Sequence, residues 1–189
     1  MSQLRLLLFA LILPALTGCT ALAVGGVVAG TAVLLDSRHV NTQIDDSGLR
    51  LRVVKAIGDA PLLHRQRIQV IAYNGDVLLV GQVINEGLKQ QAGRIAREAG
   101  APLNLFNELQ VGNLATLGER SKDTWITTRV KSQLLGNPDF DTSGIKVVTE
   151  NSEVFLLGLV EPNIAQHAVD IARNVNGVKR VIRVFNLVQ

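Results

Sequence analysis

Val77-Leu78-Leu79-Val80-Gly81-Gln82-Val83 and Val154-Phe155-Leu156-Leu157-Gly158-Leu159-Val160 are two versions of one segment, an apolar run with a glycine at its fifth position. A short apolar run that follows turn residues predicts a strand. The two segments lie 77 residues apart. The chain therefore repeats itself, and the fold of one half predicts the fold of the other.

The repeat extends well beyond these strands. At the same separation, Leu49, Val53, Ile57 and Pro61 align with Ile126, Val130, Leu134 and Pro138, and Ile68 and Val70 align with Ile145 and Val147. At a separation of 76 residues, Ala92, Ile95, Ala96 and Arg97 align with Ala168, Ile171, Ala172 and Arg173. A match of this length indicates a duplicated module of roughly 65 residues, and two copies make two small domains rather than a solenoid.

Each copy has the same predicted order of elements: helix, strand, strand, helix, strand. The first helix begins at Leu49 or Ile126, with Ser47 or Asp123 as its expected N-terminal cap. The two strands that follow meet at Asn74-Gly75, a type I′ hairpin signal, and at Asn151-Ser152, a weaker version of that turn. The second helices are predicted over 86–99 and 161–175, and the closing strands over 103–111 and 178–188.

This order predicts an α/β (α+β) fold for each module. A hairpin followed by a helical crossover gives a mixed three-stranded sheet with both helices on one face, which makes a two-layer sandwich. Roughly 65 residues are marginal for independent stability, so the modules are expected to dock on each other.

The first residues have the pattern of an export signal. A basic residue precedes the apolar run 6–16, and small residues lead to Cys19, the only cysteine of the chain. Leu16-Thr17-Gly18-Cys19 resembles the lipobox of bacterial lipoproteins, which implies that residues 1–18 are removed and that Cys19 is acylated. A membrane-spanning helix is disfavoured because Pro14 interrupts the run and a span needs about 20 apolar residues.

The lipobox resemblance also implies a location. Several acyl chains hold a protein firmly to a bilayer, whereas one binds only marginally. In lipoproteins with this signal, a residue other than Asp after the cysteine, here Thr20, implies the outer membrane of a diderm bacterium, with the body of the chain facing the periplasm. The predicted division is then a lipidated tether and linker (19–45), a first module (46–112), a linker (113–121) and a second module (122–189).

The two copies resemble BON domains, named for bacterial OsmY and nodulation proteins. The resemblance rests on the element order, on Leu79-x-Gly81-x-Val83 and Leu156-x-Gly158-x-Val160, and on Gly177-Val178-x-x-Val181 before the last strand. Together with the lipobox, the segment 123–128 and the segment 153–160, the copies resemble the dual-BON outer-membrane lipoproteins of Gram-negative bacteria. That resemblance implies a non-catalytic protein that binds anionic phospholipid, chiefly through its second module, and supports outer-membrane integrity.

The first helix of the second module carries an off-core stripe suited to lipid. With Ile126, Val130 and Leu134 facing the core, the other side holds Trp125, Thr128, Ser132 and Leu135, flanked by Arg129 and Lys131. An outward indole suits the depth of lipid headgroups, and each cation contributes about 1 kcal/mol near an anionic surface. The same positions of the first copy, Gly48, Leu51, Lys55 and Gly58, include no aromatic residue. Further candidates to extend the patch are Arg173, Lys179 and Arg180.

The sequence leaves alternatives open. Trp125 and Leu135 would equally suit packing against the other module or the linker, because an off-core apolar pair marks an interface without identifying it. The cations would then be ordinary solvated side chains. The same face would also suit an adaptor that recognises another envelope protein.

Composition and spacing argue against several other functions. The formal net charge is +3 without clustered cations, so nucleic-acid binding is not predicted. A single cysteine rules out an intramolecular disulfide or a multi-thiolate metal site. His39, His64 and His167 lie near no cysteine or paired acid, so neither catalysis nor a cofactor is predicted. Asp139 and Asp141 fall short of the six or more oxygens that calcium takes.

Overall fold

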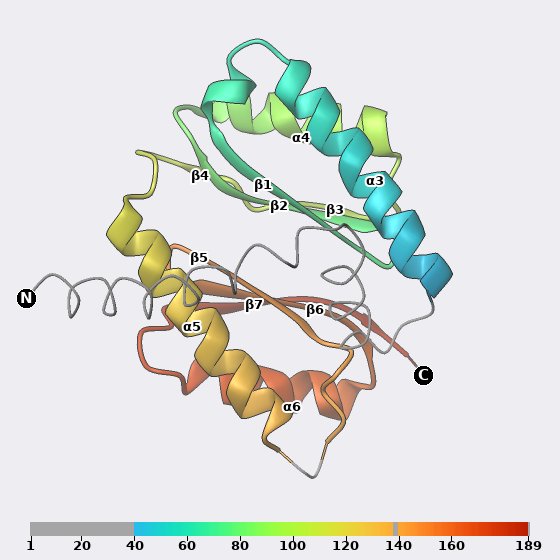
Figure 1. The fold of residues 1–189 in the computed structure, drawn as a ribbon, viewed down its shortest axis with the longest axis vertical. Helices are drawn as coiled ribbons and strands as arrows, with labels where there is room; N and C mark the ends of the chain where they lie inside the picture. The colour runs from blue at the N-terminus through green and yellow to red at the C-terminus, as the bar shows by residue number, and fades with distance from the viewer. Residues whose placement is uncertain (1–39, 138–139, 189) are drawn as a thin grey trace, which may run out of the picture. The chain divides into compact units, whose positions relative to one another are not determined.

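The computed structural model describes residues 40–137 and 140–188, and these residues belong to one compact unit. Two modules of like architecture follow each other in this unit (Figure 1). The predicted signal segment 1–18, Cys19 and most of the predicted tether lie outside the described residues.

Module 1 contains two long helices and a small mixed sheet. Its elements are α3 (Val40–Asp59), a short 3-10 helix (Leu63–Arg65), β1 (Arg67–Tyr73), β2 (Asp76–Val83), α4 (Glu86–Gly100), β3 (Leu105–Asn107) and β4 (Gln110–Val111). Strand β2 is central: it pairs antiparallel with β1 on one side and parallel with β3 and β4 on the other.

Module 2 repeats this plan. Its elements are α5 (Leu117–Leu135), β5 (Lys146–Glu150), β6 (Glu153–Val160), α6 (Pro162–Arg173) and β7 (Arg180–Leu187). Strand β6 pairs antiparallel with β5 and parallel with β7. The predicted fold class, with helix, strand, strand, helix, strand and a mixed sheet in each copy, is confirmed. The sheet has the three predicted strands in module 2, whereas in module 1 the third strand is divided into β3 and β4.

Both hairpins turn as the sequence predicts. Asn74 and Gly75 have φ values of 51° and 81°, and Asn151 and Ser152 have values of 51° and 65°. Positive φ at both central residues is the property of the type I′ turn, whose twist matches that of the flanking strands. Serine therefore adopts in module 2 the left-handed conformation that glycine supplies in module 1.

Each module has a core of its own between its helices and its sheet. The first helix of each module contributes the same positions of the repeat, as predicted: Leu49, Val53 and Ile57 in module 1, and Ile126, Val130 and Leu134 in module 2. In Figure 1 the two helices of each module lie together on one side of their sheet.

A third apolar cluster joins the two sheets through the faces that the helices leave open. It contains Ile71, Tyr73, Leu78 and Val80 from module 1, and Val148, Phe155, Leu157 and Val184 from module 2. Successive strand residues face opposite sides, so β2 is buried along all of its length. The modules therefore dock through their sheets, as the size of a single module led us to expect.

Polar contacts across this joint come in equivalent pairs. The Tyr73 hydroxyl donates to the Gly144 carbonyl, and at the equivalent positions Arg67 donates to Glu150 over 2.7 Å. Tyr73 and Glu150, like Arg67 and Gly144, are separated by the 77 residues of the repeat. A second pair of equivalent contacts joins a side-chain amide to a carboxylate: Asn186 donates to Asp76 at 2.9 Å, and Gln110 donates to Glu153 at 3.1 Å. Such reciprocal contacts are those of an interface with twofold symmetry.

The predicted caps Ser47 and Asp123 are wrong, because both first helices begin earlier. Helix α5 starts after Thr116, whose hydroxyl accepts from the Glu119 amide while the Glu119 carboxylate accepts from the Thr116 amide at 2.7 Å. This is a capping box, and Thr-x-x-Glu was its signal in the sequence. Helix α3 reaches back to Val40 because residues 40–47 contain no proline or glycine. Residues 40–45 and 117–121, predicted as linker, are therefore helical.

The closing strand of module 1 is interrupted, whereas that of module 2 is continuous. The predicted strand 103–111 divides into β3 and β4, on either side of Glu108 and Leu109. The interruption lies beside Gly81, where β2 leaves the extended conformation with a φ of 123°. Its equivalent in module 2, Gly158, is not among the residues with positive φ.

We expect Gly81→Ala to destabilise the protein strongly. A Cβ atom at Gly81 would lie 1.9 Å from the Arg67 carbonyl oxygen, and the φ of 123° is strained for any other residue. Strain and overlap together should lower the free energy of unfolding by about 2–4 kcal/mol. Urea unfolding of residues 38–189, followed by circular dichroism, measures the change.

The matched control is Gly58→Ala in α3, where a Cβ atom would meet nothing within 4 Å. We expect this variant to be neutral or stabilised by up to about 1 kcal/mol. Equal unfolding midpoints for the two variants would contradict the role given to Gly81.

Candidate functional site

Helix α5 presents all six residues predicted for lipid binding to solvent. Trp125, Thr128, Arg129, Lys131, Ser132 and Leu135 are each exposed. The Trp125 side chain is 49% exposed and that of Leu135 is 68% exposed. Neither side chain is therefore buried against module 1 or against residues 113–121.

Two stripes adjoin each other on the solvent side of α5. Successive helix residues are about 100° apart, so residues three or four apart share a side. The outer face consists of Trp125, Thr128, Ser132 and Leu135. The groove stripe consists of Arg120, Thr124, Thr127 and Lys131, and it lies between the outer face and the core. Arg129 lies on the other side of the outer face.

A groove runs beside α5 and includes the groove stripe in its wall. It encloses about 430 Å³, which lies within the usual range for ligand sites. Module 1 contributes Arg67 and Gln69 from β1, and module 2 contributes residues from α5 and β5. The sequence did not predict this groove, because its walls come together only when the two sheets dock.

The acidic side chains near the groove are already engaged. Both Asp123 carboxylate oxygens accept from turn amides, and the buried Glu150 carboxylate accepts from Arg67 at 2.7 Å and from Gln82 at 2.6 Å. Arg120 and Lys131 make no ion pair with any residue that the structure describes. The groove therefore has two cations that no ion pair engages among the described residues, and it is suited to an anion.

Asp123 seats α5 on the sheet of its own module. Its two carboxylate oxygens accept from the backbone amides of Asn151 and Ser152, each at 2.8 Å. Asp46 makes the same two bonds, also at 2.8 Å, to the hairpin turn of module 1. In each module one carboxylate thus satisfies the turn amides and fixes the first helix against the hairpin.

The capping box fixes the start of the same helix. The Thr116 amide and hydroxyl, both donating to Glu119, hold the pKa of that carboxyl below its usual value. Because the folded-state pKa is lowered, the contribution to stability is fully present above the ordinary pKa of a glutamate. It is lost as the pH falls through the lowered value.

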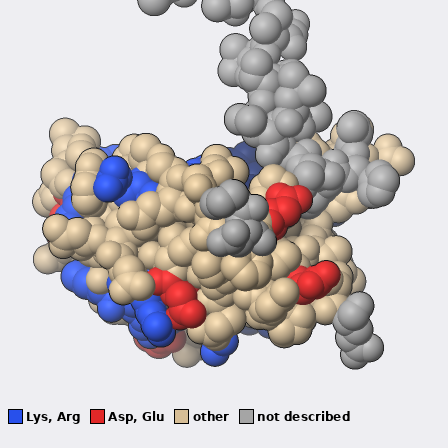
Figure 2. All heavy atoms as spheres, turned by 90° about the horizontal axis from the view of Figure 1, so that it is seen from below, with Lys and Arg blue, Asp and Glu red and all other residues tan. Residues whose placement is uncertain are grey.

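The further basic candidates are held in local contacts. Arg180 donates to Glu153 at 2.9 Å, which raises the pKa of Arg180, and Arg173 pairs with Asp170 at 3.0 Å. Lys179 donates to Asn151 at 3.3 Å. Figure 2, which views the molecule from below the orientation of Figure 1, shows Lys and Arg gathered toward one side of a largely uncharged face.

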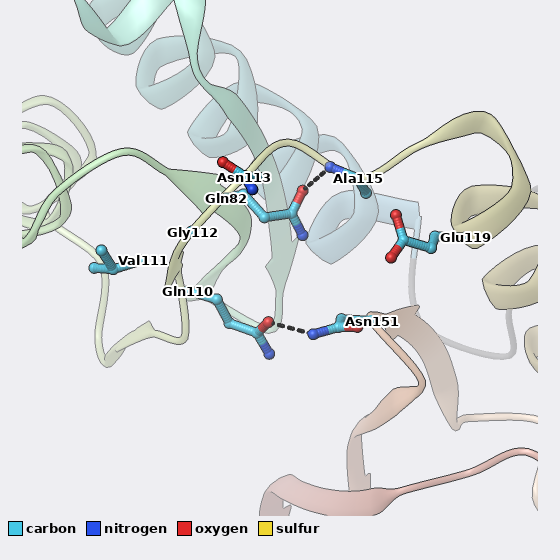
Figure 3. Close-up of a pocket in the computed structure, with 8 residues that line it drawn as sticks. All are labelled: Gln82, Gln110, Val111, Gly112, Asn113, Ala115, Glu119 and Asn151. Carbon is cyan, nitrogen blue, oxygen red and sulfur yellow. Dashed lines mark hydrogen bonds between the residues drawn. The ribbon is translucent and has the colours of Figure 1, made fainter.

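A smaller pocket beside the linker is lined by side chains that bond to one another or to the backbone. It encloses about 190 Å³, below the usual range for ligand sites. In Figure 3 the Gln82 side chain accepts from the Ala115 amide, and Gln110 accepts from the Asn151 side chain at 2.7 Å. Its polar groups are thus used to hold the linker to module 1 and to join module 1 to the hairpin of module 2.

The loop after α5 is held by His167, Phe140 and Asp141. The His167 Nε2 atom lies 2.8 Å from the Asn137 side-chain nitrogen, and its ring centroid lies 4.1 Å from that of Phe140. Hydrogen bonds from Ser143 lower the pKa of Asp141. Within residues 40–137 and 140–188, no three His, Cys, Asp or Glu side chains converge as a metal site.

Comparison with known proteins identifies the family. The BON domain matches residues 45–113 and again 122–189. Over 171 residues the chain is 40% identical to the outer membrane lipoprotein DolP of Haemophilus influenzae, covering 90% of this chain and 89% of that one. The chain belongs to the BON-domain family, among its DolP-like members. The resemblance that the sequence suggested is confirmed.

Two further relatives also match this chain over most of their length. The chain is 43% identical over 156 residues to the 21 kDa hemolysin of Actinobacillus pleuropneumoniae, covering 82% of this chain and 80% of that one. It is 26% identical over 156 residues to the osmotically-inducible protein Y of Escherichia coli, covering 81% and 78%. Among the described residues, no helix is long and apolar enough to cross a membrane.

We expect Asp123→Ala to destabilise module 2 and loosen α5. The substitution leaves the amides of Asn151 and Ser152 without their acceptor, and an unsatisfied buried amide costs about 1–3 kcal/mol. The free energy of unfolding should fall by about 2–4 kcal/mol, measured by urea unfolding of residues 38–189. Asp46→Ala should have a similar effect through module 1.

Asp45→Ala is the matched control, because Asp45 is an exposed neighbour of Asp46 on the same helix. Its effect should stay within about 0.5 kcal/mol. An Asp123→Ala variant as stable as Asp45→Ala would refute the conclusion that the Asp123 carboxylate fixes α5 against the hairpin.

Proposed function

We propose that this chain is an outer-membrane lipoprotein, anchored through acylated Cys19 and facing the periplasm. Its second module binds anionic phospholipid through the outer face of α5, and this binding supports the integrity of the outer membrane. The protein acts without catalysis. The observation that carries the proposal is the exposed Trp125 on a firmly seated helix, with cations on both sides.

The outer face has the chemistry that a membrane interface requires. Indole rings favour the headgroup region because they combine a large apolar area with one hydrogen-bond donor. Leu135 adds apolar area on the same face, where 68% of its side chain is exposed. Arg129 and Lys131 flank the face, so each can reach lipid phosphate while Trp125 inserts.

Seating and tethering make a small contact surface sufficient. Ile126 and Val130 on the core side of α5 are fully buried, and Asp123 bonds the helix to the hairpin. The outer face therefore keeps its geometry on binding. A lipid anchor at Cys19 would hold the module near the bilayer at high effective concentration, and weak contacts are then enough.

Module 1 lacks these features at the equivalent positions of α3. Leu51 is exposed, but Lys55 pairs with Asp59 at 2.6 Å, which raises the pKa of Lys55 and neutralises the charge locally. No aromatic side chain stands where module 2 has Trp125. This difference supports the assignment of lipid binding to module 2.

We expect residues 38–189 to co-sediment with vesicles that contain phosphatidylglycerol, and not with purely phosphatidylcholine vesicles. Trp125→Glu should weaken this binding by at least about tenfold, because it removes the inserting ring and adds a charge that the membrane repels. Raising the salt concentration to 0.5 M should weaken the wild-type binding as well.

Leu51→Glu is the matched control, since it places the same charge on an exposed apolar position of α3 in module 1. We expect it to keep wild-type binding within about twofold. A wild-type protein that binds neither vesicle would refute the lipid proposal and favour an adaptor for another envelope protein, which would be indifferent to vesicle composition.

Anchoring is tested separately on the full chain expressed in a Gram-negative bacterium. We expect wild type to incorporate labelled palmitate and to fractionate with the outer membrane, whereas Cys19→Ser should be unlabelled and absent from that fraction. Thr20→Asp should keep the label but leave the outer membrane. Palmitate incorporation by Cys19→Ser would contradict the assignment of Cys19.

A further inference from the structure

The groove beside α5 adjoins the outer face but is not explained by it. Thr128 belongs to the outer face and also lines the groove, and Lys131 lines the groove and flanks the outer face, whereas Arg67, Gln69 and Arg120 line only the groove. We infer that this groove holds the phosphate of the bound anionic phospholipid, so that module 1 takes part in headgroup recognition. The inference rests on the proposed function and names the site within it.

Three cations converge on the groove from two modules. Arg120 and Lys131 stand on one stripe of α5, where they form no ion pair with any described residue. Arg67 reaches the groove from β1. Its bond to Glu150 uses one of five guanidinium N–H groups, and 27% of its side chain remains exposed. Donors of this kind are those that recognise phosphate.

Neutral donors complete the site. The Gln69 side chain is exposed on β1 at the groove, and its amide can donate to a phosphate oxygen. The Thr127 hydroxyl donates to the Thr149 hydroxyl at 2.8 Å, so the Thr149 O–H group remains available to donate to a ligand. The hydroxyls of Thr124 and Thr128 donate instead to helix carbonyls at 2.9 Å, and these two residues mainly shape the wall.

No carboxylate in the wall competes for the anion. Asp123 is the only acidic residue that lines the groove among the described residues, and both of its oxygens accept turn amides at 2.8 Å. Glu150, behind the wall, is buried and bonded to Arg67 and Gln82. Against these two carboxylates stand the three cations Arg67, Arg120 and Lys131, so the groove keeps an excess of one positive charge.

The position of the groove favours a lipid phosphate over a free anion. The groove stripe and the outer face are neighbours on one helix, so insertion of Trp125 at headgroup depth brings Arg120 and Lys131 to the level of the phosphates. A groove of about 430 Å³ admits a phosphodiester with its polar substituent. A quaternary ammonium substituent would be repelled by the same cations, which favours anionic headgroups.

The test compares charge substitutions inside and outside the groove, in residues 38–189 with phosphatidylglycerol vesicles. Arg120→Glu and Gln69→Glu should each lower the affinity by about fivefold or more. Their matched controls are Arg94→Glu and Gln90→Glu, which make the same charge changes at exposed positions of α4, and both should stay within about twofold of wild type. Urea unfolding of each variant checks that the fold is retained.

The source of the phosphate is tested by nuclear magnetic resonance with soluble ligands. Dihexanoyl phosphatidylglycerol below its micellar concentration should shift the amide signals of Gln69 and Thr127, while dihexanoyl phosphatidylcholine and inorganic phosphate at equal concentration should shift them at most weakly. Equal shifts with inorganic phosphate would overturn the assignment to lipid.

The outcomes separate this inference from the proposed function. If wild type binds the vesicles and Trp125→Glu does not, but Arg120→Glu and Gln69→Glu match their controls, the outer face is the lipid site and the groove inference is wrong. If wild type binds no vesicle, the proposed function itself fails and the inference falls with it.

Discussion

The burial of β2 and β6 on both faces is the constraint on which the rest of the structure depends. One face of each sheet is covered by the helices of its own module, and the other is covered by the opposite sheet through Leu78, Val80, Phe155 and Leu157. Neither sheet could leave its second apolar face in water without a large cost. Docking therefore sets the position of each groove and helix face relative to the neighbouring module, including the groove that Arg67 and α5 both line.

The first helices of the two modules, α3 and α5, are fixed to their hairpins in the same way but expose different side chains to solvent. Asp46 and Asp123 make identical bonds to their hairpins, so the backbone of one helix is a fair guide to the other. The outward residues are free to differ, because they carry none of the packing. Module 2 has used this freedom for Trp125 and unpaired cations, whereas module 1 has Leu51 and a neutralised Lys55.

The sequence predicted what local periodicity and repetition encode. Alternating apolar residues, the Asn74-Gly75 turn and the spacing of Ile126, Val130 and Leu134 were enough for the element order and the exposed position of Trp125. It failed where a residue acts over a distance. Asp123 resembles a cap in sequence, and only the fold places its carboxylate on amides 28 and 29 residues away. Arg67 and Arg120 are likewise far apart in the chain, and no local pattern brings them to one groove.

The reciprocal contacts of the joint bear on how such a chain could arise. Tyr73 with Gly144 and Glu150 with Arg67 join the same two positions of the repeat, with different chemistry, as would happen if two once-identical modules met around a symmetry axis. A gene encoding one module could thus have given a homodimer, and fusion of two copies would have preserved its geometry. Fusion also ends the requirement that both halves be identical. A substitution at Trp125 or Gly81 then alters one half alone, which lets ancestral duplicates acquire separate tasks within one polypeptide.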